Sequence, residues 1–447
     1  MGADASVMQA LAGRLRFGLI DLIRRTRTVA TLRQLESLQF EPPAHLQQRQ
    51  QALLQAYVAL LRRASPLYAP MASFAQFPVI DKRYANAHRA ALSNAAYRGK
   101  LVHKKTGGST GEPFVYTTGV TAQSYLWAAI LLSWRVAGYR LGEPVAFIAG
   151  SALFGSGVRQ KIYYALMNVR MFSAFDLSPA RLDAYAEAIA AGRCRLVYGY
   201  ASAIHQLALR LLQRPPVRRP AFRLRAVICT AEVLTAEMRA TIAQAFGVPC
   251  YSQYGCNDGG VSAYECERRD GFHLITERAY AEVLDGGRLI STDLTNDAFF
   301  LPRYDTGDLV DMAAPGDAPC PCGRGFPLIR KVVGRANDLV EDQRGHRVHS
   351  EFFTHLFRAD PRISAFQVLY DDSALVVILH CADAALEEQG AHWDRYRERI
   401  GAALAFADLR IAVNRPFLAT QNGKHRFVMR VDDARRALDQ TATCSSG

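Results

Sequence analysis

A ten-residue stretch in the first quarter of the chain, KKTGGSTGEP, has the composition of an anion-binding turn. It runs from Lys104 to Pro113 and places three glycines, a serine and two threonines behind two lysines. Glycines adopt backbone conformations closed to other residues, so successive N–H groups can converge on one anion. The hydroxyls of Thr106, Ser109 and Thr110 would add donors. The turn therefore suits a polyphosphate, although it lacks the ending of the Walker motif. An ordinary hairpin turn is the alternative.

Cysteines and a histidine form a second group of residues, whose types suit the binding of a metal ion. Cys320 and Cys322 make a short chelate, and Cys266 and His273 lie upstream in YECERRDGFHL. Four such ligands from two segments suit a closed tetrahedral zinc site, for which we choose these four residues and keep Cys256 as a reserve ligand. In a reducing compartment paired cysteines indicate a metal before a disulfide. A free thiol pair beside a surface histidine is the alternative.

The elements that must position these residues change character along the chain. Residues from about 7 to 100 have apolar side chains at helical spacing, as in ALLQAYVALLRRA, and predict helices. From about 100 to 310, short apolar runs alternate with amphipathic stretches, which is typical of an α/β layered domain with a largely parallel sheet. The expected strands include PVAFIAGS, CRLVYGY and RAVICTAE, and the expected helices are SPARLDAYAEAIAAG and TAEMRATIAQAFG.

The remainder of the chain follows other patterns. YAEVLDGGRLISTDL places Asp-Gly-Gly between alternating apolar runs and predicts a hairpin. After about residue 336, AFQVLYDDSALVVILHCA predicts a strand pair, EQGAHWDRYRERIGAALAF a helix and LRIAVNRPF a strand. We therefore expect an α/β protein with a large, multi-layer N-terminal domain over residues 1–336 and a small α+β domain over residues 337–447.

Composition limits the classes of protein that the chain can represent. Of 447 residues, 50% are hydrophobic and 21% are charged, which argues against global disorder. The net charge of +13 favours polyanions, phosphorylated ligands or acidic surfaces, although an ordinary basic surface is the alternative. No run approaches the roughly 18 apolar residues of a membrane span, and the basic N-terminus is not a signal peptide. We expect a cytoplasmic protein with no membrane partner.

Four further motifs follow the glycine-rich turn in a specific order: QYGCNDGG (253–260), RYDTGDL (303–309), GRANDLVEDQRG (334–345) and NGKHR (422–426). With TGGSTG and CPCGR, this set resembles the adenylate-forming superfamily of acyl-CoA synthetases, luciferases and peptide-synthetase adenylation domains. It is most similar to the phenylacetate–coenzyme A ligase branch and its capsule-biosynthesis relatives. The resemblance implies an N-terminal AMP-binding domain, a hinge at Asn337 and a C-terminal lid.

The resemblance also implies a nucleotide site for ATP. The β- and γ-phosphates would lie in the glycine-rich loop, Ala231 and Glu232 would follow the adenine, and Tyr254 and Gly255 would line the nucleotide pocket. Asp308 would accept the ribose hydroxyls, since a carboxylate can accept two donors at once, and Arg335 would assist. The loop residues are Thr106, Gly107, Gly108, Ser109, Thr110 and Gly111.

The catalytic residues implied in the same way are Asp258 and Lys424. Asp258 stands where the family has the glutamate that holds Mg²⁺, a cation that prefers carboxylate oxygens. Lys424 matches the lid lysine that bridges the α-phosphate and the attacking carboxylate. Phe114 stands where the family often has a further lysine, so we expect cationic help from Lys104 or Lys105.

The implied activity is the joining of a carboxylic acid to ATP, with release of pyrophosphate, and transfer of the acyl group to coenzyme A. Phe154, Tyr200 and Ser202 are candidate walls of the acyl pocket and suit an aryl or similar acid. An amine, an alcohol or a carrier-protein thiol is the alternative acceptor. A non-catalytic nucleotide-binding protein and a nucleic-acid-binding protein are remote alternatives, and no groove-reading motif supports the second. The sequence leaves open whether the protein forms a homodimer.

Overall fold

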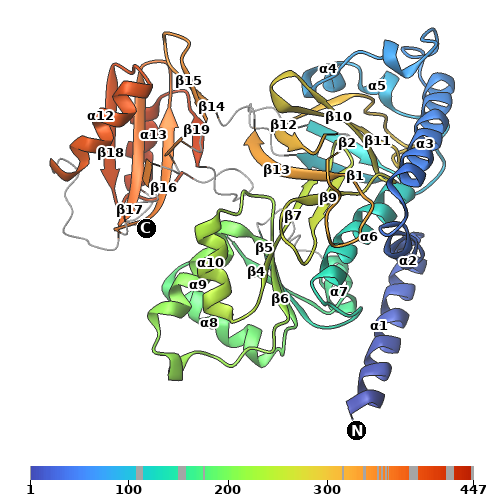
Figure 1. The fold of residues 1–447 in the computed structure, drawn as a ribbon, viewed down its shortest axis with the longest axis horizontal. Coiled ribbons are helices and arrows are strands. Elements are labelled where there is room, and N and C mark those ends of the chain that lie inside the picture. The colour runs from blue at the N-terminus through green and yellow to red at the C-terminus, as the bar shows by residue number, and fades with distance from the viewer. Residues whose placement is uncertain are drawn as a thin grey trace. The chain divides into compact units, whose positions relative to one another are not determined.

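The computed structural model describes residues 2–106, 114–149, 158–174, 177–314, 317–335, 339–349, 352–353, 356–357, 360, 362–381, 391–418 and 427–443. The chain divides into two compact units, Met1–Val333 and Gly334–Gly447, whose helices and strands are labelled in Figure 1. Helices and sheets occur in both units, so the predicted mixed α/β class is confirmed. Among the described residues, no helix combines the length and the apolar character needed to cross a membrane.

A mixed sheet of eleven strands forms the centre of the first unit, in the order β10-β11-β12-β13-β9-β8-β7-β6-β5-β3-β4. Its parallel part runs from β4 to β7, and every residue of β3 and β5 is buried. Strands that are covered on both faces are expected to be continuous apolar runs, and this made them recognisable. The parallel strands are β3 (Val145–Ala149), β4 (Val169–Ser173), β5 (Leu196–Tyr200), β6 (Ala226–Thr230) and β7 (Cys250–Cys256).

The other part of this sheet is antiparallel, so the expectation of a largely parallel sheet is wrong for its second half. Short turns join β7 to β8, β8 to β9 and β10 to β11, and such turns can join only antiparallel neighbours. The hairpin predicted at Asp285-Gly-Gly is confirmed as β10–β11. The antiparallel strands are β8 (Val261–Glu265), β9 (Phe272–Leu274), β10 (Ala279–Leu284), β11 (Arg288–Asp293), β12 (Tyr304–Met312) and β13 (Leu328–Arg335).

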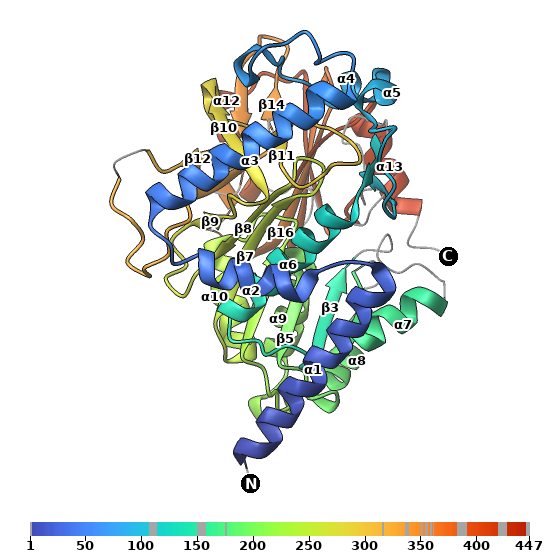
Figure 2. The same ribbon diagram turned by 90° about the vertical axis from the view of Figure 1, so that its right-hand side faces the viewer.

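Two groups of helices accompany the sheet. Helices α8, α9 and α10 pack side by side near the parallel strands, whereas α1, α2 and α6 lie together in another part of the unit (Figures 1 and 2). Helix α10 begins where the Thr235 hydroxyl accepts a hydrogen bond from Met238 N (3.1 Å), and it ends at Gly247 in the left-handed conformation. The helices are α1 (Gly2–Arg24), α2 (Thr28–Leu38), α3 (Pro43–Ala64), α4 (Lys82–Ala87), α5 (Arg89–Leu92), α6 (Val120–Val136), α7 (Val158–Leu166), α8 (Pro179–Ala191), α9 (Ala201–Gln213) and α10 (Ala236–Phe246).

A separate two-stranded hairpin flanks the glycine-rich turn. It consists of β1 (Val102–Thr106) and β2 (Phe114–Thr118), and Thr106 pairs with Phe114. Alternate residues of β2 are buried, which matches a strand that covers a core with one face. The hairpin therefore brings the two ends of the turn together.

The second unit has a four-stranded sheet in the order β18-β17-β16-β19 and a small two-stranded sheet, β14–β15. The strand pair predicted around Asp371-Asp372-Ser373 is confirmed as β16–β17, which are antiparallel. Its core includes Trp393, Tyr396 and Ile400 from the predicted helix region. The elements are β14 (Leu339–Glu341), β15 (Arg347–His349), β16 (Ile363–Tyr370), β17 (Ala374–Cys381), β18 (Asp408–Val413), β19 (Val428–Arg430), α12 (Asp394–Ala403) and α13 (Ala434–Thr443).

Candidate functional site

Several of the predicted site residues lie at the carboxyl ends of the parallel strands. Tyr200 ends β5, while Ala231 and Glu232 follow β6 directly. The Glu232 side chain accepts a hydrogen bond from the backbone N–H of Ser202 (2.8 Å), which joins the expected adenine segment to the expected acyl-pocket segment. Open α/β sheets bind ligands at this edge, because loops from neighbouring strands meet there.

Ala231 has an unusual backbone conformation at this edge. Its φ is +69°, in the left-handed region that residues with a side chain rarely occupy. Such strain persists only where the surrounding structure enforces it, and it is concentrated at functional sites. The conformation supports the assignment of this turn to a binding site.

Tyr254 and Asp308 come from two different motifs and meet in the structure. The Tyr254 hydroxyl donates a hydrogen bond to Asp308 Oδ2 at 2.6 Å. Tyr254 lies on β7 and Asp308 on β12, and the Asp308 carboxylate is 7% exposed. The fold thus brings together two of the residues expected around the nucleotide.

The Asp258 carboxylate lies just beyond the end of β7 and is held by two donors. The Cys256 thiol donates to Oδ1 at 3.0 Å, and the Tyr304 hydroxyl donates to Oδ2 at 2.8 Å. Lys82 Nζ lies 3.9 Å from Oδ2. Burial, followed by the charge of Asp258, raises the pKa of both the Cys256 thiol and the Tyr304 hydroxyl, so both groups keep the protons that they donate.

The turn that carries Asp258 is fixed by its neighbours. Gly260 has a φ of +72°, and a Cβ added there would lie 2.5 Å from the Asp293 side chain. The Ser291 hydroxyl donates to the carbonyl of Gly259 at 2.6 Å. Contacts with β11 therefore determine the position of this turn.

An aromatic cluster connects Asp258 with the hairpin that carries the glycine-rich turn. Phe114 at the start of β2 is fully buried, and its ring is stacked with Tyr116 (5.3 Å between centroids) and with Tyr304 (6.2 Å). Phe114 stands where the related family often has a lysine. In this chain the residue belongs to the core and supports the tyrosine that binds Asp258.

Of the two lysines at the start of the glycine-rich turn, Lys104 is the one whose side-chain environment the structure describes. Burial, together with the positive charges of Arg24 and Arg278, lowers the pKa of Lys104 from its ordinary 10.5 to about 8. Arg278 is itself 2% exposed, and its guanidinium donates to the Ser262 hydroxyl and to the carbonyl of Val261. Arg24 and Lys104 are half-buried, and the charge of Asp293 acts on Arg278. The positive charges near Lys104 would favour an anion beside it.

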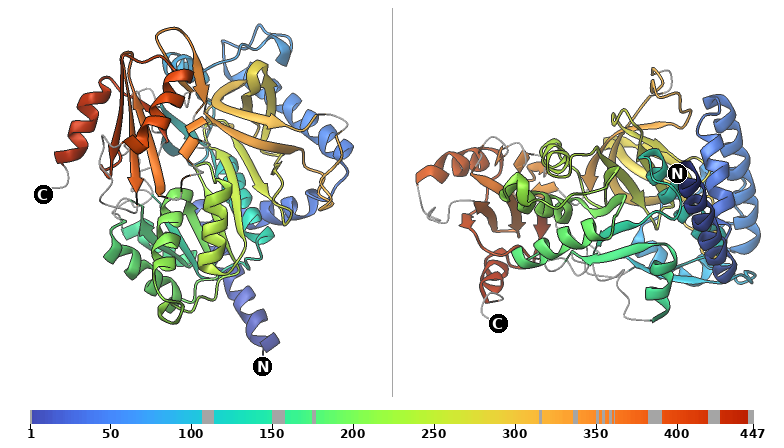
Figure 3. Two further views of the ribbon diagram at one scale, coloured as in Figure 1. Left: turned by 60° about the vertical axis from the view of Figure 1, so that its left-hand side comes forward. Right: turned by 90° about the horizontal axis from the view of Figure 1, so that it is seen from below.

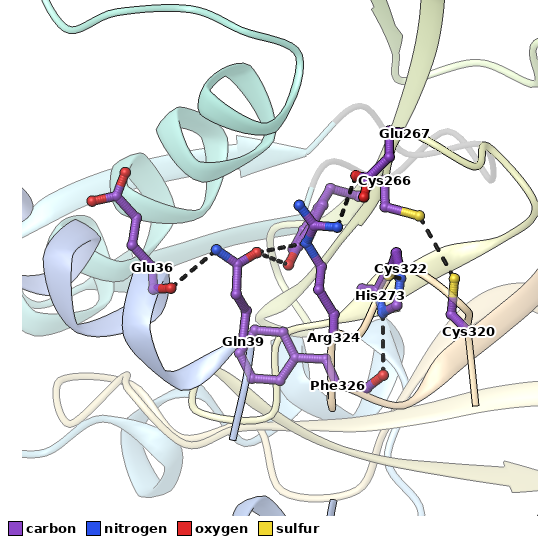
Figure 4. A network of polar contacts seen from close by, with 10 residues as sticks. Glu36, Gln39, Cys266, Glu267, His273, Cys320, Cys322, Arg324 and Phe326 are labelled. Atoms are coloured by element: carbon purple, nitrogen blue, oxygen red, sulfur yellow. Dashed lines mark hydrogen bonds and ion pairs between the residues drawn. The ribbon is translucent and has the colours of Figure 1, made fainter. Parts of the chain in front are cut away.

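The four expected metal ligands lie together. One ligand atom from each of Cys266, His273, Cys320 and Cys322 lies within 4.8 Å of the others. Figure 4 shows Cys266 and Cys320 facing each other, with their sulfurs 3.7 Å apart, and His273 Nε2 is 3.3 Å from Cys322 Sγ. Cys256, the reserve ligand, is bonded to Asp258 and lies outside this group.

The protonation and orientation of His273 suit metal ligation. His273 is fully buried, and burial lowers the pKa of its imidazole. Its Nδ1 lies 3.3 Å from the carbonyl of Phe326, which directs Nε2 toward Cys322. A neutral imidazole whose second nitrogen is bonded to a carbonyl is the usual form of a histidine ligand.

A second layer attaches the cysteine loop to the helices. Arg324 donates to Gln39 Oε1 at 2.8 Å and to Glu267 at 2.8 Å, and Tyr264 donates to the same oxygen of Gln39 at 2.9 Å (Figure 4). The backbone N–H of Gly325 donates to the carbonyl of Gln39 at 2.7 Å. The loop is therefore anchored to the end of α2.

Several predicted site residues lie outside the described residues. These are Gly107–Gly111 of the glycine-rich turn, Phe154 of the acyl pocket, Asn337 of the hinge and Lys424 of the lid. The backbones of Lys105, Thr106 and Arg335 lie in strands, but their side chains are not described. The functional assignments of all of these residues stay predictions.

Lys82 and Tyr304 are site residues that the sequence reasoning did not identify. Tyr304 lies inside the quoted RYDTGDL motif, so a closer analysis of that motif could have found it. Lys82 is the first residue of the six-residue helix α4, which Asp81 caps by accepting a hydrogen bond from Tyr84 N (2.8 Å). Its approach to Asp258 is a tertiary contact that no local pattern indicates.

Sequence comparison finds relatives of two kinds. The chain is 24% identical over 254 residues to protein CapK of Staphylococcus aureus, and this aligned region covers 55% of each chain. It is 28% identical over 249 residues to phenylacetate-coenzyme A ligase of Pseudomonas putida, which covers 52% of this chain and 54% of the relative. The chain thus matches about half the length of these curated relatives. No family model matches it.

Comparison of structures gives a fold match over most of the chain. A crystal structure of 2-hydroxyisobutyryl-CoA ligase, in the postadenylation state with R3-HIB-AMP, superimposes with a TM-score of 0.64. The sequences are 18% identical, and the match covers 90% of this chain and 91% of the ligase. The relatives and the fold confirm the resemblance to adenylate-forming enzymes of the phenylacetate–coenzyme A ligase branch.

We predict that Lys104 titrates near pH 8, because burial and two neighbouring guanidinium groups disfavour its charged form. NMR of protein labelled at the lysine ε-carbon would follow this titration, and Lys104→Arg would assign the signal. The Arg24→Gln substitution should raise the pKa of Lys104, since it removes one of the repelling charges. A titration at the ordinary value of 10.5 would contradict the described environment.

Proposed function

We propose that this chain, which has the fold of an acyl-CoA ligase and is related to phenylacetate-coenzyme A ligases, activates a carboxylic acid with ATP. The product of the first step would be an acyl-adenylate with release of pyrophosphate, and the second step would transfer the acyl group to coenzyme A. The observation that carries the proposal is the hydrogen bond of 2.6 Å between Tyr254 and Asp308, which belong to two separate nucleotide motifs.

The surroundings of this hydrogen bond support the proposal. Ser202 and Glu232, joined at 2.8 Å, lie at the carboxyl ends of neighbouring parallel strands, where ligands of α/β sheets bind. In the proposed complex the Asp308 carboxylate accepts the ribose hydroxyls, and Ala231 and Glu232 border the adenine. Arg335 and the loop from Thr106 to Gly111 are assigned from the motifs.

The first chemical step joins two anions. A carboxylate oxygen of the acid forms a bond to the α-phosphorus, and the bond between that phosphorus and the pyrophosphate oxygen breaks. The ammonium group of Lys424 would lie between the carboxylate and the α-phosphate, where it would reduce their repulsion. In the second step the acceptor thiol loses its proton, its sulfur bonds to the acyl carbon and AMP leaves.

Asp258 is proposed as the carboxylate ligand of Mg²⁺. A carboxylate offers about four lone-pair positions, and the thiol of Cys256 and the hydroxyl of Tyr304 occupy two of them. The remaining positions suit a hard cation. A magnesium ion bound there would neutralise charge on the phosphates, while Cys256 and Tyr304 keep the carboxylate oriented.

Coenzyme A is the proposed acceptor, and an aryl or similar carboxylic acid is the proposed substrate. The curated relatives named phenylacetate-coenzyme A ligase support both assignments. Tyr200, which is buried at the end of β5, would form a wall of the acyl pocket together with Ser202 and Phe154. A panel of carboxylic acids, followed by coenzyme A or hydroxylamine and mass analysis of the products, tests this part.

Zinc is the metal that the cluster of three cysteines and His273 fits. Three thiol sulfurs and one imidazole nitrogen within 4.8 Å are a donor set that zinc binds in tetrahedral structural sites. When bound, the metal would tie the turn after β8 to the loop before β13. Its role would be structural, because all four positions are filled by protein ligands.

The Lys424→Ala variant should lose acid-dependent ATP–pyrophosphate exchange by at least about a hundredfold, since it removes the cation between the reacting anions. Arg399→Ala, which removes an exposed positive charge from α12 in the same unit, is the matched control and should retain the wild-type rate. Exchange near the wild-type rate in Lys424→Ala would exclude the proposed role of this lysine.

The Asp258→Asn variant should need a higher magnesium concentration for half-maximal exchange, and its maximal rate should fall about a hundredfold or more. Asp311→Asn removes an exposed carboxylate from the same region and should change neither quantity. The assignment of Asp258 fails when the two variants have the same magnesium dependence as the wild-type protein.

Protein purified without chelator should contain about one equivalent of zinc, as expected for a closed four-ligand site. The Cys320→Ser/Cys322→Ser variant should lose the metal and melt at a lower temperature, whereas Cys256→Ser should retain it. Elemental analysis and thermal melting measure both effects. A zinc content below about half an equivalent in the wild-type protein would overturn this assignment.

A further inference from the structure

Helix α1 has an apolar face that does not pack against the first unit. Leu15, Leu19, Leu22 and Ile23 are 67%, 45%, 75% and 58% exposed, although the helix is otherwise docked on the unit. At about 100° per residue these four side chains fall within an arc of roughly 100° on one side of the helix. Figures 1 and 3 show the first part of α1 extending clear of the rest of the unit. The apolar stripe is therefore exposed.

The rotation of α1 is fixed by contacts on its other face. Phe17 and Ile20 are 2% and 5% exposed, and both belong to the main hydrophobic core. A Cβ added at Gly13 would lie 1.9 Å from the carbonyl oxygen of Leu141, so the backbones are in direct contact there. The helix cannot turn the stripe inward without losing this packing.

Polar contacts at the end of α1 fix it further. Asp21 accepts hydrogen bonds from the backbone N–H groups of Thr28 (2.8 Å) and Val29 (3.0 Å) at the start of α2. Arg24 donates to the Tyr163 hydroxyl at 2.8 Å and to Gln123 at 3.0 Å. These hydrogen bonds hold the end of α1 in one orientation within the first unit. In that orientation the leucines face solvent.

Exposed arginines surround the stripe. Arg14 and Arg16 lie on opposite sides of it, and Arg25 and Arg27 are exposed just beyond the end of the helix. Asp21 is the one acidic residue in the sequence from position 12 to position 27, and it is occupied at the start of α2. The stripe is thus an apolar surface with a positively charged border, in a chain of net charge +13.

We propose that this face of α1, the stripe Leu15–Leu19–Leu22–Ile23 with its bordering arginines, binds the surface of a bilayer that contains anionic phospholipids. An amphipathic helix with arginines beside its apolar side chains can bury the latter at the boundary of headgroups and acyl chains, while the arginines contact phosphate groups. The expectation of no membrane partner rested on the lack of a spanning segment, which does not bear on surface binding.

The charge pattern favours this partner over two others. A second copy of α1 would bring arginines close to arginines with no free carboxylate between positions 12 and 27 to offset them. A nucleic acid would neutralise the arginines but would leave four large apolar side chains in water. An anionic bilayer satisfies both parts of the surface. The inference does not rest on the proposed ligase activity.

The test is sedimentation of the full chain with vesicles of phosphatidylcholine and phosphatidylglycerol, compared with vesicles of phosphatidylcholine alone. Wild-type protein should bind the anionic vesicles, and added salt should weaken the binding. The Leu19→Gln/Leu22→Gln variant should bind at least about tenfold more weakly, because it removes the apolar contact. The Arg14→Gln/Arg16→Gln variant should lose vesicle affinity by about fivefold per arginine, and the salt dependence of its binding should be weaker than that of the wild-type protein, because Arg25 and Arg27 remain.

Matched controls separate this surface from general effects of charge and hydrophobicity. Val217→Gln removes an apolar side chain that is 93% exposed elsewhere, and Arg62→Gln/Arg63→Gln removes two exposed charges from α3. Both should bind vesicles within about twofold of the wild-type protein. Thermal melting checks that every variant is folded.

Three results would overturn the proposal. The first is equal sedimentation of wild-type protein with neutral and anionic vesicles, and the second is an equal loss of binding in the control variants. The third is a dimer, detected by analytical ultracentrifugation, that Leu19→Gln/Leu22→Gln dissociates while no vesicle binding is observed. That result would assign the stripe to a second copy of the chain.

Discussion

The burial of the Asp258 carboxylate constrains the structure around it. The carboxylate of a residue that is only 7% exposed needs hydrogen-bond donors, because an unpaired charge in a low-dielectric interior is costly. The donors come from β7, through Cys256, and from β12, through Tyr304, and Lys82 of α4 lies nearby. Three segments that are far apart in the sequence are thereby held around one carboxylate. Displacement of the turn after β7 would leave a buried charge without partners.

The same constraint reaches the glycine-rich turn through aromatic packing. Tyr304 is stacked with Phe114, which is fully buried. Phe114 is the first described residue after the glycine-rich turn. On the other strand of the hairpin, Lys104 has a lowered pKa because it is buried and lies near Arg24 and Arg278. Crowded cations are relieved by an anion, so a phosphate bound at the turn would stabilise the hairpin as well as being held by it. The hairpin strand β2 and the proposed magnesium ligand Asp258 are therefore supported by one aromatic core.

Much of this arrangement could be predicted from the sequence, but only where neighbouring residues in the chain form the pattern. The buried apolar runs of β3, β5 and β6 and the Asp285-Gly-Gly turn of β10–β11 were recognisable from neighbouring residues. The antiparallel half of the sheet was not, because β9 pairs with β13 through Leu328 and His273, which belong to distant segments. The contact between Lys82 and Asp258 is equally non-local. The clustering of the three cysteines with His273 was predictable because such residue types are rare enough to be matched across segments.

The cysteine and histidine group also explains how an irregular loop can hold its place in the first unit. Apart from the undescribed positions 315 and 316, residues 313–327 contain neither helix nor strand. Backbone hydrogen bonds to the sheet, from Ala313 N to Leu328 O and from Leu274 N to Pro327 O, lie at the two ends of the loop and leave its middle to other contacts. The order of the middle comes instead from the contacts of Arg324 and Gly325 with Gln39 and from the four clustered ligands. A bound metal would add a cross-link to this irregular loop, beside the burial of Phe326 in the main core. Because the loop ends where β13 (Leu328–Arg335) begins, its order also fixes the start of that strand.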